Sequence, residues 1–261
     1  MMNKNFIGID ISTHNGEIEW GKVSSEVNFA MIRCGYGKSG DDKRFIENAE
    51  GCKKFGIPFG VYYFSYAGNN VEAEHEALRA IQLADRFKPQ IGIAFDFEDD
   101  SLRYIRDKGY STSTENIEYI AKSFLDVIEK NSNYTPILYT NVSYYKKYYY
   151  NLNCSKWLAQ WGVNEPSVDC DIWQYSSKGK VSGIFSFVDL NFADVLPGLH
   201  NENVYYKNIT EIFKKYEEKY YKLAKETING KYGNGAERVA RLKSLGYDYN
   251  FVQAIVNKLV K

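Results

Sequence analysis

The chain has few residues of the kinds that hold metals, build disulfide frameworks or cross membranes. Among its 261 residues only 4 are Cys, 3 are His and 5 are Pro. No two cysteines form a C-x-x-C pair and the histidines have no metal-binding spacing, so we expect reduced thiols, no metal and no cofactor. No apolar run is long enough to serve as a signal peptide or to span a membrane. We therefore expect a protein made in a host cytoplasm, without membrane insertion, that needs separate release to reach an outside target.

Aromatic side chains, in contrast, are abundant. The chain contains 23 Tyr, 15 Phe and 4 Trp, which together make 16% of its residues. Such rings fill hydrophobic cores, and their faces also stack on the apolar faces of sugar rings. The excess therefore suits a carbohydrate-binding protein, although core packing explains many single positions.

Charge is unevenly distributed along a chain whose formal net charge is zero. The segment from Asn203 onward carries 12 Lys/Arg against 6 Asp/Glu, which leaves 21 against 27 in the preceding residues. A basic tail on an acidic body indicates an anionic partner for the tail. Because the basic residues alternate with Glu and form no polybasic run, we expect a bacterial wall polymer rather than nucleic acid.

Short apolar segments alternate with amphipathic helical patterns through the first two-thirds of the chain. Strands are expected at eight segments, namely 6–11, 29–34, 58–64, 91–98, 136–139, 156–160, 171–175 and 187–190. Helices are expected at 45–55, 71–87, 115–130 and near 143–150, with almost nothing helical between the last three strands. Apolar strands separated by helices predict a parallel sheet buried on both faces. Eight of them predict an incomplete (β/α) barrel of the α/β class.

Acidic residues lie at or near the ends of several of these strands. Asp10, Asp96, Glu98 and Asp189 all have this position, and in such barrels the catalytic groups lie at the carboxyl ends of the strands. Asp96 and Glu98 are two residues apart, so on a strand they share a face with Cα atoms roughly 6.6 Å apart. Acidic pairs also end strands as solvated caps, but burying four acids at one mouth is costly without a task.

Two carboxylates in one cleft push their pKa values apart, so that one keeps its proton while the other stays ionised. Glycoside hydrolysis requires this pair, because an acid protonates the leaving oxygen and an anion stabilises positive charge at C1. Asp96 and Glu98 are therefore candidate catalytic residues of a glycosidase.

Five motifs together resemble family 25 glycoside hydrolases. They are Gly8-Ile9-Asp10-Ile11-Ser12, Asp96-Phe97-Glu98, Trp157-Leu158-Ala159-Gln160-Trp161, Trp173-Gln174-Tyr175 and Val188-Asp189-Leu190-Asn191. The resemblance covers residues 5 to 195, in the family's order and spacing. It implies a flattened eight-stranded barrel with helices mainly in its first part. It also implies a lysozyme, often a bacteriolytic phage endolysin, that cleaves the β-1,4 bond between N-acetylmuramic acid and N-acetylglucosamine in peptidoglycan.

The same resemblance assigns unequal roles to the acids. Glu98 is similar to the family's general acid/base, and Asp96 to the carboxylate that orients the 2-acetamido group or acts directly on the cationic centre. Asp10 and Asp189 would complete the acidic cluster. The family is thought to retain anomeric configuration with help from the substrate's N-acetyl group. Phe97 is a mild departure from the family pattern that leaves both acids in place.

Substrate-binding candidates are aromatic and polar residues near the strand ends. The aromatic residues either line sugar subsites or plug the barrel, and the two polar residues are weaker candidates. In chain order the six are Arg33, Tyr62, Tyr139, Gln160, Trp161 and Trp173, and Tyr36 and Gln174 are further weak candidates.

After Pro197-Gly198 the pattern changes to that of a small all-α module. An amphipathic helix is expected from Tyr205 to Leu223, followed by helices at 236–245 and 250–260. The segment 223–261 resembles the short wall-binding repeats at the ends of some phage lysozymes. We therefore expect a catalytic domain at 1–198, a linker and amphipathic helix at 199–222 and a wall-binding repeat at 223–261.

The repeat occurs once, whereas such repeats usually occur in tandem and gain avidity from several sites. The apolar stripe from Tyr205 to Leu223 either packs the repeat onto the catalytic domain or pairs with the same helix of another chain. The second option would form a homo-oligomer and restore a second copy.

Two other functions are compatible with parts of the pattern. A chitinase-like hydrolase also uses a barrel and a short acidic motif, but it needs a D-x-x-D-x-D-x-E pattern that this strand lacks. A catalytically inactive wall-binding protein would not need four acids at the strand ends.

Overall fold

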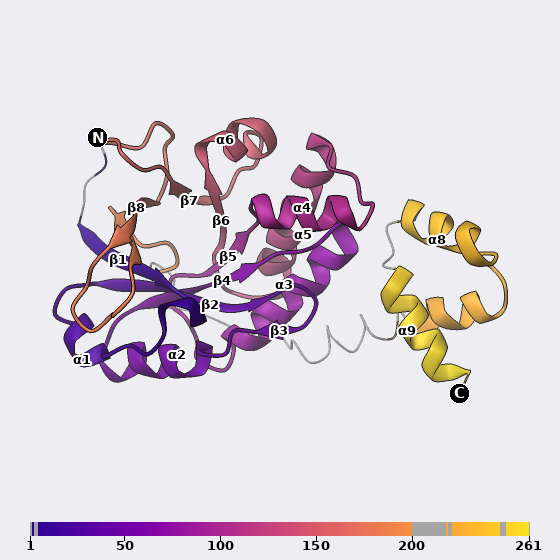
Figure 1. The fold of residues 1–261 in the computed structure, drawn as a ribbon, viewed down its shortest axis with the longest axis horizontal. Coiled ribbons are helices and arrows are strands. Elements are labelled where there is room, and N and C mark those ends of the chain that lie inside the picture. The colour runs from indigo at the N-terminus through magenta and orange to yellow at the C-terminus, as the bar shows by residue number, and fades with distance from the viewer. Residues whose placement is uncertain (1, 3–4, 200–217, 219–220, 246–248, 261) are drawn as a thin grey trace.

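The computed structural model describes residues 2, 5–199, 218, 221–245 and 249–260. In this part of the chain an eight-stranded barrel precedes a small group of helices (Figure 1). The barrel strands are β1 (Phe6–Ile11), β2 (Phe29–Tyr36), β4 (Phe59–Phe64), β5 (Ile93–Asp96), β6 (Pro136–Asn141), β7 (Ser155–Ala159), β8 (Ile172–Gly179) and β9 (Val188–Ala193). Their order is β1-β9-β8-β7-β6-β5-β4-β2, and a β1–β2 pairing closes the barrel. The two-residue β3 (Gly40–Asp41) pairs antiparallel with β2. The predicted eight-stranded barrel is confirmed.

The direction of the last strand differs from the prediction. β1, β2 and β4 to β8 pair in parallel, but β9 is antiparallel to both β8 and β1. Residues 180–187 alone join β8 to β9, and a parallel crossover needs a dozen or more residues. The short connection therefore forces a hairpin, and the prediction of a wholly parallel sheet is wrong for this strand.

Helices cover the outside of the first part of the barrel (Figure 1). They are α1 (Trp20–Val23), α2 (Phe45–Lys54), α3 (Asn70–Ala84) and α5 (Thr114–Asn131). After β6, α6 (Val142–Tyr144) leads into a π-helical turn, η2 (Tyr145–Tyr149). From 150 to 199, all of which is described, the chain forms no helix. This matches the prediction that helices occur mainly in the first part.

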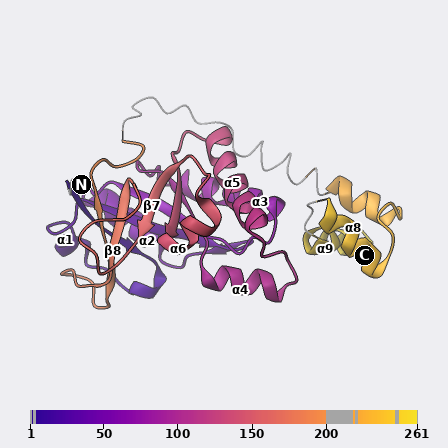
Figure 2. The same cartoon turned by 90° about the horizontal axis from the view of Figure 1, so that it is seen from above.

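Two α-helices of the barrel part were not predicted from the sequence, the four-residue α1 and the longer α4 (Asp99–Asp107). α4 begins directly after Glu98 and lies apart from the layer of α3 and α5 (Figure 2). Its first turn contains Asp99 and Asp100, and acidic residues stabilise the amino end of a helix. Because it follows Glu98, α4 helps to fix that residue.

Two apolar layers separate the inside of the barrel from the outside. Strand residues that point outward, such as Ile32 and Phe95, pack against the helices. Residues that point inward form a second cluster with Met31, Ala94 and Trp157 at its centre. The barrel is therefore a packed core, and its polar inward residues lie above this cluster.

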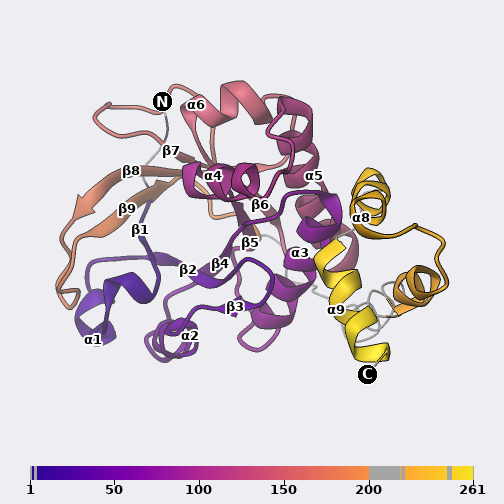
Figure 3. The same ribbon diagram turned by 45° about the vertical axis from the view of Figure 1, so that its right-hand side comes forward.

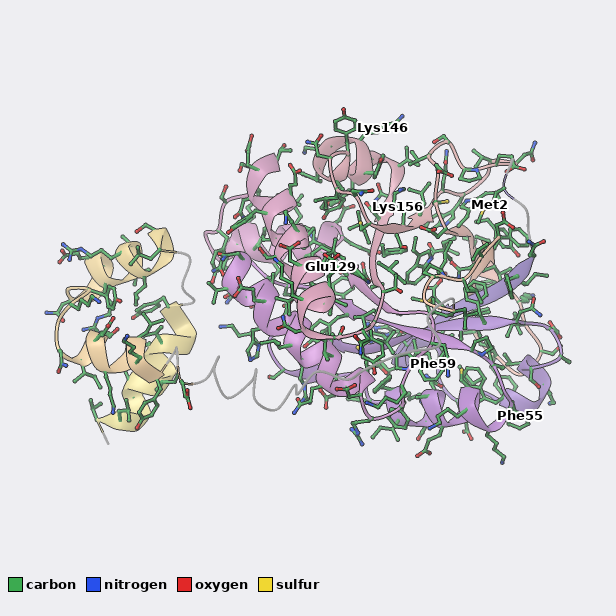
Figure 4. The ribbon with its side chains drawn as sticks, turned by 180° about the vertical axis from the view of Figure 1, so that it is seen from behind. Met2, Phe55, Phe59, Glu129, Lys146 and Lys156 are labelled. Carbon is green, nitrogen blue, oxygen red and sulfur yellow. The ribbon has the colours of Figure 1, made fainter. Side chains whose placement is uncertain are left out.

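The C-terminal helices form a separate apolar cluster. A helix at 221–228 is followed by α8 (Gly235–Ser244) and α9 (Tyr249–Leu259). Their cluster includes Val71 and Leu78 of α3, and Figure 3 shows α9 beside α3. The repeat thus contacts the catalytic barrel through α3. Met2 and Phe55 lie at the opposite end of the molecule (Figure 4).

Most of the predicted helix from Tyr205 to Leu223 lies outside the described residues. The domain limits 1–198, 199–222 and 223–261, and self-association through the apolar stripe, therefore stay predictions. Across the described part of the chain, no helix has the length and apolar character that crossing a membrane requires.

Candidate active site

Asp10 and Asp189 face each other across the β1–β9 pairing. The two residues are directly paired in register, so their side chains project from the same face of the sheet. Asp10 lies at the carboxyl end of β1, whereas Asp189 is the second residue of β9. Because β9 runs antiparallel, its beginning reaches the mouth at which the parallel strands end. Asp189 therefore joins the predicted cluster from the opposite end of its strand.

Buried amides hold Asp10 in place. Its Oδ2 accepts from Gln174 Nε2 at 3.0 Å and from Asn191 Nδ2 at 2.8 Å. Burial raises the pKa of Asp10 well above its usual range, and the nearby charge of Asp189 raises it further, although both amides oppose the shift. Burial also raises the pKa of Asp189, while a hydrogen bond from Asp10 opposes that rise. Oδ2 is occupied by two donors, so the other oxygen of Asp10 is the one that is suited to share a proton with Asp189.

Asp96 is the last residue of β5 and is 4% exposed. Its Oδ1 has no hydrogen-bond partner among the described residues. Burial raises the pKa of Asp96 well above its usual range, the charges of Glu98 and Asp10 add to the shift, and Arg33 opposes it. A buried carboxylate oxygen without a donor is costly, so this position is suited to a donor brought by a ligand.

Glu98 lies two residues beyond the end of β5, at the N-cap of α4. The prediction that Asp96 and Glu98 share one strand is therefore wrong for Glu98, although its backbone is still extended, with φ −126° and ψ −169°. Its N–H donates to Ser101 Oγ at 3.2 Å, which ties it to the first turn of the helix. Burial raises the pKa of the half-buried Glu98, the Tyr139 hydroxyl lowers it, and the charge of Asp189 raises it.

Tyr62 and Tyr139 form the floor beneath these acids. Both pack edge-on against Trp157, with ring centroids 5.8 Å and 4.5 Å away. The Tyr139 hydroxyl is 3.2 Å from Gln174 Oε1, and Tyr139 pairs in register with Asp96. Tyr62 and Tyr139 therefore plug the barrel and also lie close to the acids.

Arg33 is inward-facing beside Tyr62, its register partner on β4. Its Nε binds the buried Asp42 at 2.8 Å, and its guanidinium lies 5.6 Å from the centre of the Tyr36 ring. The fixed cation opposes the rise in the pKa of Asp96. Arg33 thus belongs to the electrostatic surroundings of the acids.

The structure separates the remaining predicted residues. Trp161 is 54% exposed, and its Nε1 donates to Gln174 Oε1 at 3.3 Å, so it stands at the rim. Trp173 is 2% exposed, and its ring lies 6.1 Å from Phe192, outside the barrel wall. Its Nε1 donates to the Gln160 carbonyl, while Gln160 Oε1 accepts from Ser167. Trp173 and Gln160 therefore fix the β7–β8 loop and do not join the acids.

Asn191 is a site residue to which the sequence analysis gave no role. It is fully buried, donates to Asp10, and accepts from Trp157 Nε1 at 2.7 Å. Its position two residues after Asp189 places both on one face of β9, which is the pattern that could have identified it. Among the described residues, no group of three or more His, Cys, Asp or Glu is arranged to hold a metal ion.

Comparisons with known proteins agree with this geometry. Residues 9–184 match the model of glycosyl hydrolases family 25, and residues 221–260 match the CW_7 repeat. The chain is 30% identical to a lysozyme of Streptococcus phage Cp-7, over 77% of this chain and 56% of that protein. It is 28% identical to Lysozyme M1 of Streptomyces globisporus, over 70% of this chain and 66% of that protein. The chain thus spans less than two-thirds of the length of these curated relatives.

A solved structure has the same fold. The modular autolysin LytC from Streptococcus pneumoniae, in complex with a synthetic peptidoglycan ligand, superposes with a TM-score of 0.62 at 26% identity. The match covers 71% of this chain and 46% of that one. The family match extends over more than half of the chain and contains Asp10, Asp96 and Glu98. This chain therefore belongs to glycosyl hydrolase family 25 and carries one CW_7 repeat at its C-terminal end.

Proposed function

We propose that this chain is a lysozyme that hydrolyses the β-1,4 bond between N-acetylmuramic acid and N-acetylglucosamine in bacterial peptidoglycan. The observation that carries the proposal is the cluster of Asp10, Asp96, Glu98 and Asp189 at one mouth of a family 25 barrel. The names of the relatives, both lysozymes, support the same activity.

Glu98 is the proton donor in this proposal. It is only half-buried, so substrate can reach it, and the burial that raises its pKa favours its protonated form. In the forward step its proton passes to the glycosidic oxygen as the bond to C1 breaks. The resulting carboxylate then takes a proton from the attacking water.

Asp96 is the partner that contacts the substrate, and the donor that the substrate brings favours its anionic form, against the rise in pKa that burial causes. Its unpaired Oδ1 would accept the N–H of the 2-acetamido group of the sugar at the cleavage point. Holding that group fixes its carbonyl oxygen near C1, and the negative charge of Asp96 stabilises the positive charge that develops there. A sugar that lacks the acetamido group would leave Oδ1 unpaired and would be a poor substrate.

Asp10 and Asp189 form the support of the site. Because they share one proton, the pair contributes about one negative charge opposite Asp96 and Glu98. Gln174 and Asn191 keep Asp10 in one orientation. The charge of the Asp10–Asp189 pair therefore stays the same while Glu98 loses and regains its proton.

The CW_7 repeat would bind the chain to its insoluble substrate. The repeat belongs to the basic end of the chain, and bacterial walls are rich in anionic groups. We infer that peptidoglycan is the partner of both parts, and that the protein acts on the wall as a bacteriolytic endolysin of phage type after release from the cell that makes it.

The experiment that tests the activity is incubation with purified Gram-positive walls, with turbidity, reducing ends and free amines followed together. A lysozyme clears the suspension and releases reducing ends without new amines. Release of amines alone would indicate an amidase or peptidase, and clearing of chitin but not of walls would indicate a chitinase. Binding to walls without any release would indicate an inactive binding protein.

A further inference from the structure

A second hollow lies beside the active site and is lined mainly by tyrosines. Its volume is about 390 Å³, and its wall includes Tyr36, Tyr66, Glu76, Tyr104, Lys108 and Tyr110. We refer to it as the tyrosine hollow. Its size is within the range of small-molecule binding sites, and no role assigned above to the catalytic acids involves it.

An adjoining hollow extends from it toward the barrel strands. This space of about 510 Å³ shares Tyr36 and Tyr66 with the tyrosine hollow and is also lined by Arg33 and Phe64. Phe64 pairs in register with Asp96 on the neighbouring strand. The adjoining hollow therefore extends from the tyrosine hollow to Phe64 and Arg33, the register partner of Asp96 and the cation that opposes the rise in its pKa.

Three aromatic rings, those of Phe64, Tyr66 and Tyr104, lie next to one another along the two hollows. Phe64 and Tyr66 have ring centroids 5.2 Å apart, and Tyr66 and Tyr104 are 4.8 Å apart. The ammonium group of Lys108 lies 5.7 Å from the centre of the Tyr104 ring. Rings of this kind offer flat apolar faces to sugars, while the lysine adds a positive charge at the edge.

Glu76 is a buried acid with an unused oxygen in the wall of the tyrosine hollow. It is 1% exposed, its Oε1 accepts from Tyr66 N at 3.1 Å, and its Oε2 has no hydrogen-bond partner among the described residues. Burial raises the pKa of Glu76 to about 8, so the group is mostly protonated at neutral pH. A hydrogen bond with Ser65 and the one from Tyr66 N oppose the rise in pKa. Since Oε1 accepts from Tyr66 N, a proton on Glu76 belongs on Oε2, from which it can be donated to a ligand oxygen in the hollow.

The cations of the hollow restrict the ligand further. Lys38 lies in its wall, 3.8 Å from Glu72 Oε1, and Lys108, the residue directly after α4, also lines it. The acid Glu76, the tilted tyrosine rings and two lysines, of which Lys38 is paired with Glu72, together suit a sugar with an amide or hydroxyl oxygen and a carboxylate substituent.

We propose that the tyrosine hollow is a distal subsite that binds an N-acetylated, carboxylate-bearing ring of the same glycan strand, with Glu76 donating to one of its oxygen atoms. The inference rests on the proposed function, because the glycan strand that is cleaved at Asp96 and Glu98 would also bind in the tyrosine hollow. Its consequence is a preference for long strands over short ones.

The test measures kcat and KM on soluble glycan strands of increasing length, with the full-length chain. We expect kcat/KM to rise in a step once a strand reaches the hollow. Tyr104→Ala should reduce that step about fivefold through KM, because a ring contact of this kind is worth about 1 kcal/mol. Tyr119→Ala is the matched control, since Tyr119 is an exposed tyrosine on α5 that lines neither hollow.

Glu76 supplies a second and independent variant pair. Glu76→Gln keeps a neutral donor and should retain the step, whereas Glu76→Met removes the donor and should reduce the step as Tyr104→Ala does. Thermal unfolding of each variant checks that the barrel is intact, and Tyr104→Ala decides the question if Glu76→Met does not fold. An equal step in the wild type, Tyr104→Ala and Glu76→Met would overturn the distal subsite alone. Absence of reducing ends from strands of every length would overturn the proposed function, and this inference with it.

Discussion

The two sides of the barrel mouth treat their acids differently. On the side of β1, β8 and β9, Asp10 is held by two amides and shares a proton with Asp189. On the side of β5, Asp96 keeps one oxygen without a donor, and Glu98 stands half-buried at the start of α4. Hydrogen bonds within the protein thus satisfy Oδ2 of Asp10, whereas Oδ1 of Asp96 has no donor among the described residues. The comparison indicates that Asp10 and Asp189 support the site while Asp96 and Glu98 meet the substrate.

The strongest test of this difference is to replace Glu98, the proposed proton donor on the side of β5. Glu98→Gln keeps the size of the side chain but cannot transfer a proton to the glycosidic oxygen, so kcat should fall by about 10³-fold. Binding to walls should be unchanged, because the CW_7 repeat is intact. Pelleting with purified walls checks binding, and reducing-end release checks kcat. Lysis at the native rate would show that Glu98 is not the acid.

Removal of the anion has the next largest effect. Asp96→Asn keeps an oxygen for the acetamido N–H but lacks the negative charge, so kcat should fall by about 10²-fold. The matched variant is Asp10→Asn, which changes the same functional group on the side of β1, β8 and β9 and should have the smaller effect on kcat. If Asp10→Asn proved the more damaging of the two, the division of the mouth into a supporting and a reacting side would be wrong.

On the side of Asp10 and Asp189, loss of the Asn191 amide should lower the free energy of unfolding more than it affects kcat. Asn191→Leu leaves Asp10 short of a donor and Trp157 Nε1 without its acceptor, and each buried unpaired group costs about 1–3 kcal/mol. The free energy of unfolding should therefore fall by about 2–4 kcal/mol. Urea denaturation measures this, with Asn151→Leu at an exposed position as the control. An unchanged midpoint would show that the network does not stabilise the barrel.

The smallest expected change is a shift of pH dependence. The Tyr139 hydroxyl lowers the pKa of Glu98, so Tyr139→Phe should let that pKa rise. Because activity requires protonated Glu98, the alkaline limb of the kcat profile should move to higher pH, with kcat at its optimum changed by less than about tenfold. A limb that moves to lower pH, or stays in place, would show that Tyr139 does not tune Glu98.

Much of the barrel was predictable because its strands are short apolar segments and its helices are amphipathic. The direction of β9 was not, because apolar composition does not record the direction of a strand. Only the length of the β8–β9 connection, residues 180–187, argues for a hairpin. Helix α4 was also missed, since its apolar positions are few and its first turn is acidic.

The acids of the site could be located from strand ends, but the hydrogen bonds that hold them could not. Gln174 was a weak candidate for substrate contact, and its role as a partner of Asp10 was not predicted. Ile172-Trp173-Gln174-Tyr175 has bulky residues on both faces, so alternation alone does not say whether Trp173 or Gln174 points inward. The structure turns Gln174 inward and Trp173 outward. The role of Asn191 depends on its pairing with β1 and on Trp157, which are contacts between distant parts of the sequence.

The most direct test of the central proposal is mass spectrometry of peptidoglycan digested by the wild-type chain. Cleavage as proposed yields fragments with N-acetylmuramic acid at every new reducing end and with intact peptide stems. The same digest with Glu98→Gln should yield almost none of these fragments. New reducing ends on N-acetylglucosamine, or separation of peptides from an intact glycan, would contradict the account.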